Sequence, residues 1–249
     1  MTPKPCSYCG KPLKPRVAEL MGRTVTCGFE SCSCDGAAKA ALEEEERRKA
    51  EEFRQERERL MRRYQTAGIP PLFLQTRKGC EDVYKVVRRE AKAVIEDFRD
   101  GKGTYIVGGV GTRKSLVAAT ACRYAVDEGM SAKYTSASKV LDAVRGSYGT
   151  SKDSKAVMDS FASTRFLVLD DLGKESPTDW TLMKLFEFVN DRYENMRPLV
   201  VTTQYKRSEL IQRLGKNGDT ETAVAIVSRL TEMCGTRDYS GADQRMSNG

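Results

Sequence analysis

One short segment, residues 108–115, constrains the fold of this chain more than any other. It reads Gly-Gly-Val-Gly-Thr-Arg-Lys-Ser, which is the pattern G-x-x-x-x-G-K-S/T except that Arg113 stands where the second glycine is expected. The apolar run Tyr105–Val107 precedes it as a strand would, and the helix-forming run Leu116–Tyr124 follows. Because a loop at a helix N-terminus directs backbone N–H groups at anions, the segment predicts a nucleotide phosphate site in an α/β protein.

The loop residues have separate expected tasks. The glycines let the backbone approach phosphate oxygens, Lys114 would reach the β- and γ-phosphates, and the Ser115 hydroxyl would ligate Mg²⁺. Arg113 is the exception, because side chains avoid positive φ. If the position demands that conformation, strain of roughly 1–3 kcal/mol weakens binding. A cation beside the phosphates would offset part of this strain, so we expect binding to survive while hydrolysis suffers.

A second motif follows downstream. The apolar run Phe166–Leu169 ends in Asp170 and Asp171, as in the Walker B strand of phosphate-loop proteins. We expect Asp170 to hold Mg²⁺, directly or through water, and Asp171 to polarise the attacking water as general base. The alternative is a buried strand that ends in two capping acids.

Two later elements complete the expected site. The strand candidate Leu199–Thr203 runs into Gln204, which would place Thr203 and Gln204 beside the γ-phosphate as a sensor; the alternative is an ordinary core strand with a polar end. Arg229, on a late predicted helix, would act on a neighbouring subunit's nucleotide as an arginine finger, unless it is a surface arginine. The predicted catalytic residues are Asp171, Thr203, Gln204 and Arg229. The predicted nucleotide-binding residues are Gly108, Gly109, Val110, Gly111, Thr112, Arg113, Lys114, Ser115 and Asp170.

Cysteines mark the N-terminal region, which holds five of the chain's eight. Cys6-x-x-Cys9-Gly is a zinc-knuckle turn, and Cys32-x-Cys34 supplies the second pair, with Cys27 as a possible substitute for one of them. Four thiolates would close a structural zinc centre whose binding energy folds the module. The alternative is a redox or unpaired cluster, but no thioredoxin-like βαβ pattern surrounds the motif.

The composition excludes several kinds of chemistry. The chain has no histidine, which rules out a Ser-His triad and any histidine metal ligand. No apolar run reaches the roughly 18 residues of a membrane span, and the N-terminus lacks the apolar core of a secretion signal. We therefore expect a cytoplasmic, reducing setting and no membrane partner. The formal net charge of +7 mildly favours an acidic polymer as partner.

Composition also suggests four regions. Residues 1–35 form the expected zinc module, 36–67 a charged helical connector, 68–240 the nucleotide-binding core, and 241–249 a flexible tail. The helix expected over Ala37–Tyr64 has acid-before-base pairs such as Glu44 and Arg48, four residues apart. It is a polar connector, a docking helix for a partner, or a basic arm near nucleic acid. Pro70 and Pro71 cannot continue it.

Apolar runs alternate with helical patterns through the core, which predicts a parallel sheet with helices on both faces. Gly146–Lys155 is expected to be a flexible loop. The expected strands are Thr104–Val107, Ala132–Thr135, Phe166–Leu169 and Leu199–Thr203. The expected helices are Val83–Phe98, Leu116–Asp127, Ser138–Arg145, Asp179–Met196, Ser208–Leu214 and Ala223–Cys234.

Taken together, these motifs resemble bacterial replicative-helicase loaders of the DnaC type, and the related IstB transposition ATPases, over about residues 66–239. The resemblance is carried by Gly68-Ile-Pro-Pro, Gly108-Gly-Val-Gly-Thr, Leu169-Asp-Asp-Leu-Gly-Lys-Glu175, Arg192-Tyr-Glu-Asn195, Val200-Val-Thr-Thr203 and Ser228-Arg-Leu-Thr-Glu-Met-Cys234. It implies an AAA+ core without a full C-terminal lid, ATP-controlled oligomerisation, and contact with single-stranded DNA. It also implies docking of the N-terminal region on a hexameric helicase.

Three functions follow from these features. The first is an ATP- and Mg²⁺-dependent helicase loader, which the zinc module and charged helix favour. The second is an IstB-like transposition helper with the same ATP site and a different partner. The third is a nucleotide-defective adaptor, which rests on Arg113 alone. Gln204 stands where the family usually has asparagine, and this keeps an amide.

Overall fold

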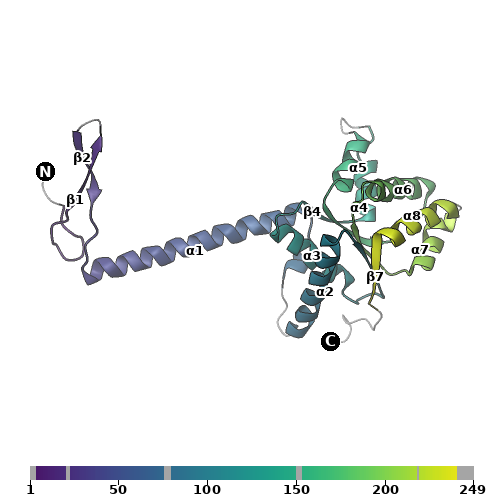
Figure 1. Cartoon of the computed structure of the whole chain (residues 1–249), viewed down its shortest axis with the longest axis horizontal. Helices are drawn as coiled ribbons and strands as arrows, with labels where there is room; N and C mark the ends of the chain where they lie inside the picture. The colour runs from purple at the N-terminus through teal and green to yellow at the C-terminus, as the bar shows by residue number, and fades with distance from the viewer. Residues whose placement is uncertain (1–3, 21–22, 76–79, 150–152, 218, 240–249) are drawn as a thin grey trace. The chain divides into compact units, whose positions relative to one another are not determined.

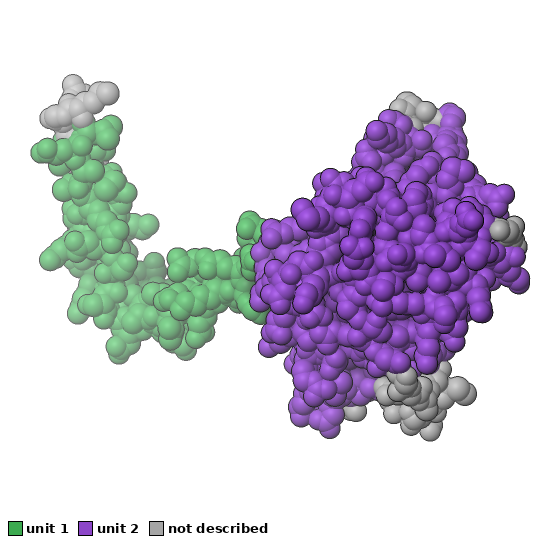
Figure 2. Space-filling view, turned by 45° about the vertical axis from the view of Figure 1, so that its right-hand side comes forward, with its two compact units in different colours: residues 1–60 green, residues 61–249 purple. Residues whose placement is uncertain are grey.

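The chain consists of two units, Met1–Leu60 and Met61–Gly249, which are coloured separately in Figure 2. This computed structural model describes residues 4–20, 23–75, 80–149, 153–217 and 219–239. The predicted tail, 241–249, lies outside these ranges. In the described part of the chain, no helix has the length and apolar composition needed to cross a membrane.

The first unit contains an antiparallel hairpin that the sequence analysis did not predict. Strands β1 (Pro15–Leu20) and β2 (Arg23–Phe29) pair along their length, and every residue of β1 is exposed. Because the hairpin buries so little, its sequence lacks the alternation that marks a half-buried strand. Among the described residues of this unit, Cys6 is the only buried apolar side chain. The module therefore has no apolar core to stabilise it.

Helix α1 (Asp35–Thr66) contains the boundary between the units. Its surface is charged, and its stabilising pairs differ in detail from those expected. Glu44 pairs with Arg47 at 2.7 Å rather than with Arg48, and Arg48 lies 3.7 Å from Glu52. Each such pair contributes only about 0.2–0.5 kcal/mol.

The second unit is built on a five-stranded sheet in the order β4-β5-β6-β3-β7. Its two edge strands, β4 and β7, are labelled in Figure 1. All four pairings are parallel, which confirms the predicted sheet. The strand that the sequence analysis missed is β7, an edge strand reading Cys-Gly-Thr-Arg-Asp, because it lacks an apolar run. The strands are β3 (Gly103–Val107), β4 (Ala132–Ser136), β5 (Phe166–Leu172), β6 (Leu199–Thr203) and β7 (Cys234–Asp238).

Helices cover both faces of this sheet, as expected. Figure 1 shows α2 and α3 together on one side and the later helices on the other. Helix α5 starts at Ser154, inside the segment expected to be a loop, of which residues 150–152 lie outside the described part. The helices are α2 (Glu81–Arg99), α3 (Lys114–Asp127), α4 (Ala137–Arg145), α5 (Ser154–Ala162), α6 (Asp179–Glu194), α7 (Arg207–Leu214) and α8 (Thr220–Met233), with 3-10 turns η1 (Pro71–Leu74) and η2 (Gly215–Asn217).

Alternate strand residues face alternate layers. Leu167 and Leu169 of β5 are completely buried and belong to the core cluster that includes residues of α4, α6 and α8. Phe166 faces the opposite layer, where its ring meets Phe98 of α2 edge-on at 4.8 Å between centroids. The continuous apolar run of β5 thus reflects burial on both faces, as parallel sheets require.

A buried arginine ties several elements of the core together. Arg192 of α6 is fully buried, and its guanidinium donates to the carbonyl oxygens of Ala162 (2.7 Å), Thr164 (2.8 Å) and Pro198 (2.6 Å). Burial lowers the pKa of Arg192 to about 10, so the group stays cationic at neutral pH. It therefore joins the end of α5 to the starts of β5 and β6.

We expect Arg192→Leu to lower the free energy of unfolding by about 3 kcal/mol or more, because buried carbonyls lose their donors. Arg197→Leu is the matched control. Arg197 is half-exposed, and its bond to the same Ala162 carbonyl is longer, at 3.4 Å. That variant should lose less than about 1 kcal/mol. Urea unfolding measures both, and equal losses would contradict this role for Arg192.

Candidate functional site

The phosphate-loop segment lies between β3 and α3, as its sequence predicts. Arg113 is the N-cap of α3 and has φ 66° and ψ 16°, in the left-handed region. The position therefore does demand the conformation that glycine adopts freely, and a side chain there adds roughly 1–2 kcal/mol of strain. In the part of the chain that the structure describes, the half-buried Arg113 side chain has no hydrogen-bond or ion-pair partner.

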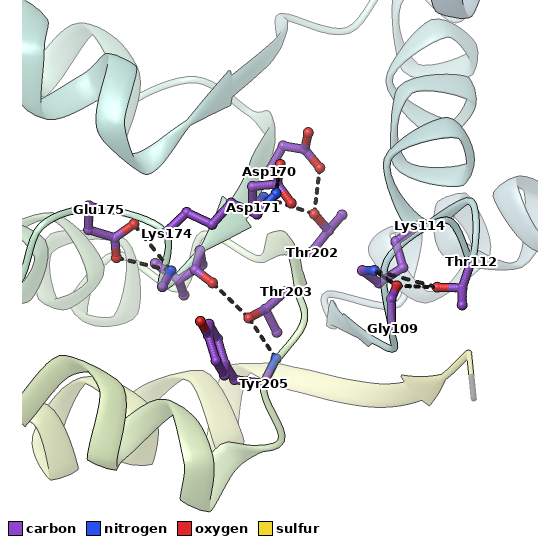
Figure 3. Close-up of polar contacts among 12 residues, drawn as sticks. Gly109, Thr112, Lys114, Asp170, Asp171, Lys174, Glu175, Thr202, Thr203 and Tyr205 are labelled. Carbon is purple, nitrogen blue, oxygen red and sulfur yellow. Dashed lines mark hydrogen bonds and ion pairs between the residues drawn. The ribbon is translucent and has the colours of Figure 1, made fainter. Parts of the chain in front are cut away.

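Lys114 is buried and folded back on its own loop (Figure 3). Its Nζ donates to the Gly109 carbonyl at 2.6 Å and lies 3.4 Å from Thr112 Oγ1. The Thr112 hydroxyl also donates to the Gly109 carbonyl, at 2.9 Å. The Gly109 carbonyl thus accepts the hydrogen bond that the Lys114 ammonium group would donate to a phosphate oxygen.

Both oxygens of Asp170 accept hydrogen bonds from hydroxyl groups. Thr202 on β6 donates to Oδ1 at 2.5 Å, and Tyr134 on β4 donates to Oδ2 at 2.5 Å. Burial raises the pKa of Tyr134, and the negative charge of Asp170 raises it further, while contact with the Ser115 hydroxyl acts in the opposite direction. Ser115 and Asp170, the two expected Mg²⁺ ligands, therefore both influence the pKa of this tyrosine.

A bulge in β5 changes the direction of its two acids. Leu169 pairs with Val201, but Leu172 pairs with Thr203, so β5 carries an extra residue there. Asp171 has φ 58°, and its N–H donates to Thr202 Oγ1 at 3.0 Å. Such bulges redirect side chains near functional sites. Figure 3 shows Thr202 pointing toward both acids.

The expected general base, Asp171, forms an ion pair with a lysine. Its carboxylate forms an ion pair with Lys174 at 2.8 Å. The turn carrying Lys174 is braced by the buried Glu175, whose two oxygens accept the N–H of Gly173 at 3.0 and 3.1 Å. A water molecule must compete with Lys174 for this carboxylate.

The expected sensor residues occupy different surroundings. Thr203 is fully buried; its hydroxyl donates to the Leu172 carbonyl at 2.7 Å and accepts from the N–H of Tyr205 at 3.2 Å. Gln204 follows at a half-buried position. Thr202, absent from the predicted set, is the β6 residue that contacts both acids. Neighbouring strand residues point to opposite faces, a rule that could have separated Thr202 from Thr203.

Arg229 lies on α8 and packs against α6 of the same chain. Its Nε donates to Asn190 Oδ1 at 2.7 Å, and its guanidinium covers the rings of Phe186 and Tyr193, at 4.7 and 5.6 Å from their centroids. Its expected role concerns a second subunit, so it stays a prediction.

The donor set fits Mg²⁺ and a nucleotide. Hydroxyl and carboxylate oxygens are the ligands that Mg²⁺ prefers, and Ser115 and Asp170 supply them beside the N-terminus of α3. This site lies at the carboxyl ends of β3, β5 and β6, where parallel sheets bind ligands.

Four cysteines meet in the first unit. The Sγ atoms of Cys6, Cys9, Cys32 and Cys34 all lie within 4.8 Å of one another. Cys6 and Cys34 are 3.8 Å apart, and Cys9 and Cys32 are 3.5 Å apart, close to the edge of about 3.8 Å in a tetrahedral Zn–S₄ site. The N–H of Tyr8 donates to Cys6 Sγ at 3.5 Å and lowers the pKa of that thiol to about 7. The cluster could thus hold a metal such as zinc.

The fifth cysteine does not join the cluster. Cys27 lies on β2, where its thiol donates to the Arg16 carbonyl at 3.4 Å. Among the ligand sets that the sequence left open, the structure brings together the one without Cys27.

Comparison with known proteins assigns the chain to a family. A family described as IstB-like ATP binding protein matches residues 90–248, which is more than half of the sequence. The chain belongs to this family.

The chain is also similar to individual proteins and solved structures. The replicative helicase loader DnaC of Escherichia coli K12 is 23% identical over 167 residues, covering 64% of this chain and 67% of the relative. The crystal structure of DnaI has a TM-score of 0.52 at 17% identity, covering 60% of this chain and 81% of that one. A DnaC helicase loader structure has a TM-score of 0.48 at 21% identity, covering 66% and 92%. The DnaI likeness supports the fold described above, a parallel sheet with helices on both faces.

For the cysteine cluster we expect about one zinc ion per chain, released by thiol modification. Cys9→Ser should lose most of it, because three thiolates and a solvent ligand bind zinc more weakly. Cys27→Ser is the matched control and should retain it. Elemental analysis of protein purified without chelators measures the content. Metal-free wild-type protein, or equal loss in both variants, would contradict the four-cysteine site.

Proposed function

We propose that this chain is an ATP-dependent helicase loader for DNA replication, acting in the cytoplasm, which binds ATP with Mg²⁺, single-stranded DNA and a hexameric replicative helicase. The observation that carries the proposal is the Asp170 carboxylate, held by Thr202 and Tyr134 in the same sheet whose strand β3 leads into the loop of Lys114 and Ser115. Membership of an ATP-binding family and similarity to DnaC over 67% of its length support it.

In this proposal the chain's own groups divide the work. The N–H groups of the loop and Lys114 bind the phosphates, which requires Lys114 to leave the Gly109 carbonyl. Ser115 and Asp170 hold Mg²⁺, which neutralises charge on the phosphate oxygens when bound. Asp171 accepts a proton from the attacking water after separating from Lys174.

The remaining predicted residues act around this centre. Thr203 and Gln204 sense the γ-phosphate from the end of β6. Gln204 contacts the phosphate directly, whereas the buried Thr203 acts through its hydrogen bond to the Leu172 carbonyl. Arg229 reaches the nucleotide of a neighbouring subunit in a homo-oligomer formed on ATP and DNA, after separating from Asn190. The oligomer thereby makes hydrolysis depend on assembly.

Arg113 sets the balance between holding ATP and hydrolysing it. Its side chain makes the left-handed backbone of the loop strained, while its cation, which has no partner among the described residues, attracts phosphate oxygens. We infer that ATP binds and that turnover is slow.

We assign separate tasks to the regions of the chain. Residues 1–35 bind zinc and dock on the helicase, residues 36–67 connect, residues 68–240 form the ATPase core and residues 241–249 a tail. The zinc cluster supports this division because a module without an apolar core folds by itself on binding metal.

Two other functions have a specific observation in their favour. The IstB-like family description favours a transposition helper, which differs only in its partner. The partner distinguishes the two: a loader binds a replicative helicase, and a transposition helper binds a transposase. The left-handed Arg113 favours a nucleotide-defective adaptor.

Binding of fluorescent ATP tests the nucleotide site. We expect measurable Mg²⁺-dependent binding by the wild type and at least about tenfold weaker binding by Lys114→Ala, because the phosphates lose a charge-assisted bond. The control is Lys102→Ala, which replaces an exposed lysine before β3.

Arg113→Gly should raise hydrolysis by about tenfold, equivalent to about 1.4 kcal/mol. Equal binding and hydrolysis with and without Arg113 would exclude the adaptor, and no binding by the wild type would exclude the ATPase.

Binding to DNA should depend on salt. We expect the affinity for a single strand to fall about tenfold or more between about 50 and 200 mM salt, because phosphate contacts release counterions. Fluorescence anisotropy with a labelled oligonucleotide measures this, and a duplex of equal length is the control. Preference for the duplex, or affinity independent of salt, would count against the proposal.

A further inference from the structure

Tyr134 is held in place from three directions. It lies on β4 with its ring buried, and Phe73 of η1 meets this ring edge-on at 6.1 Å between centroids. The N–H of Tyr134 donates to the Ala67 carbonyl at 2.7 Å. The segment after α1 therefore fixes the backbone and the ring of this residue.

Gly68 makes this close packing possible. It has φ +77°, and a Cβ at this position would lie 2.6 Å from the Tyr134 carbonyl oxygen, closer than atoms can approach. Only glycine combines that conformation with that contact. The Gly-Ile-Pro-Pro segment thus has a physical task, which is to seat the chain against Tyr134.

The fixed ring delivers its hydroxyl to the Asp170 carboxylate. Tyr134 takes Oδ2 and Thr202 takes Oδ1, each at 2.5 Å. Two donors on opposite oxygens restrict rotation of the carboxylate about its terminal bond. Each oxygen keeps a further lone pair, because an ionised carboxylate accepts about four hydrogen bonds.

We propose that Tyr134 is a positioning residue that fixes the Asp170 carboxylate, together with Thr202, in the orientation that binds Mg²⁺ beside Ser115. This inference rests on the proposed ATP site and adds to it a residue that no motif contains. Tyr134 acts through Asp170 and does not touch the phosphates.

The size of the effect follows from comparable sites. Groups that hydrogen-bond a ligating side chain typically change metal affinity or activity by about 10–100-fold when removed. Without the tyrosine hydroxyl, Asp170 keeps Thr202 on one oxygen and rotates more freely on the other. The nucleotide alone binds through the loop and Lys114, so its affinity without Mg²⁺ does not depend on Tyr134.

The chain offers a matched control in Tyr105. This tyrosine lies on β3, is fully buried, and donates its hydroxyl to the Tyr205 carbonyl at 2.8 Å. Tyr105→Phe therefore deletes a buried tyrosine hydroxyl from the same sheet without altering Asp170. Any general effect of removing such a group appears in both variants.

The test measures binding of a fluorescent ATP analogue by the full chain during a Mg²⁺ titration, and again in EDTA. Tyr134→Phe should raise the half-saturating Mg²⁺ concentration about 10–100-fold and leave the affinity in EDTA within about twofold. Tyr105→Phe should match the wild type in both. Thr202→Val should resemble Tyr134→Phe, and Thr202→Ser should restore binding because it returns the hydroxyl.

The outcomes separate this inference from the function on which it rests. A wild type without Mg²⁺-dependent binding overturns the proposed function. A responsive wild type with an equally responsive Tyr134→Phe overturns the positioning role alone. Equal losses with Mg²⁺ and in EDTA, with a lower melting temperature, also overturn it, because they indicate a structural role. If Tyr134→Phe does not fold, the Thr202→Val and Thr202→Ser pair decides the question.

Discussion

The hydroxyl of Thr202 is the contact on which the geometry of the site depends. It donates to the carboxylate of Asp170 at 2.5 Å and accepts the N–H of Asp171 at 3.0 Å. One side chain of β6 thereby holds both acids of the neighbouring strand, and it satisfies the N–H that the bulge removes from the ladder. In a regular strand, Asp170 and Asp171 would point to opposite faces. Here the bulge and Thr202 set the positions of both residues. The Asp170 carboxylate lies against the hydroxyl groups of Thr202 and Tyr134, and the Asp171 carboxylate lies against the ammonium group of Lys174.

Two lysines of the site are bonded to neighbouring groups of the chain. Lys114 lies on the Gly109 carbonyl, and Lys174 lies on Asp171. For the proposed function, Lys114 must exchange the Gly109 carbonyl for phosphate oxygens, and Asp171 must separate from Lys174 before it accepts a proton from water. Arg113 differs from both lysines, because its backbone is strained and its side chain is unpaired within the described residues. Strain of this kind persists where the surrounding fold over-determines the backbone.

The two units are stabilised by different physical means. The second has a core of apolar residues on both faces of a parallel sheet, with Arg192 bonded to carbonyls at the ends of three elements. In the first, Cys6 is the only buried apolar side chain among the residues that the structure describes, and four thiols lie within 4.8 Å of one another. The second unit is thus stabilised by apolar burial, whereas the four thiols of the first offer a site for a metal in place of such a core.

The sequence by itself determined the phosphate loop, the parallel order of apolar strands, the two acids after β5 and a pattern of cysteines able to bind metal, because these signals are local. It did not reveal the β1–β2 hairpin or β7, which bury too little to leave an apolar pattern, nor the short helix α5. Only the tertiary structure selected Cys6, Cys9, Cys32 and Cys34 over Cys27, and Thr202 over Thr203 as the partner of both acids. It alone brought Tyr134 to Asp170, because that contact joins neighbouring strands far apart in the chain. A motif records which groups are present, whereas packing decides which of them meet.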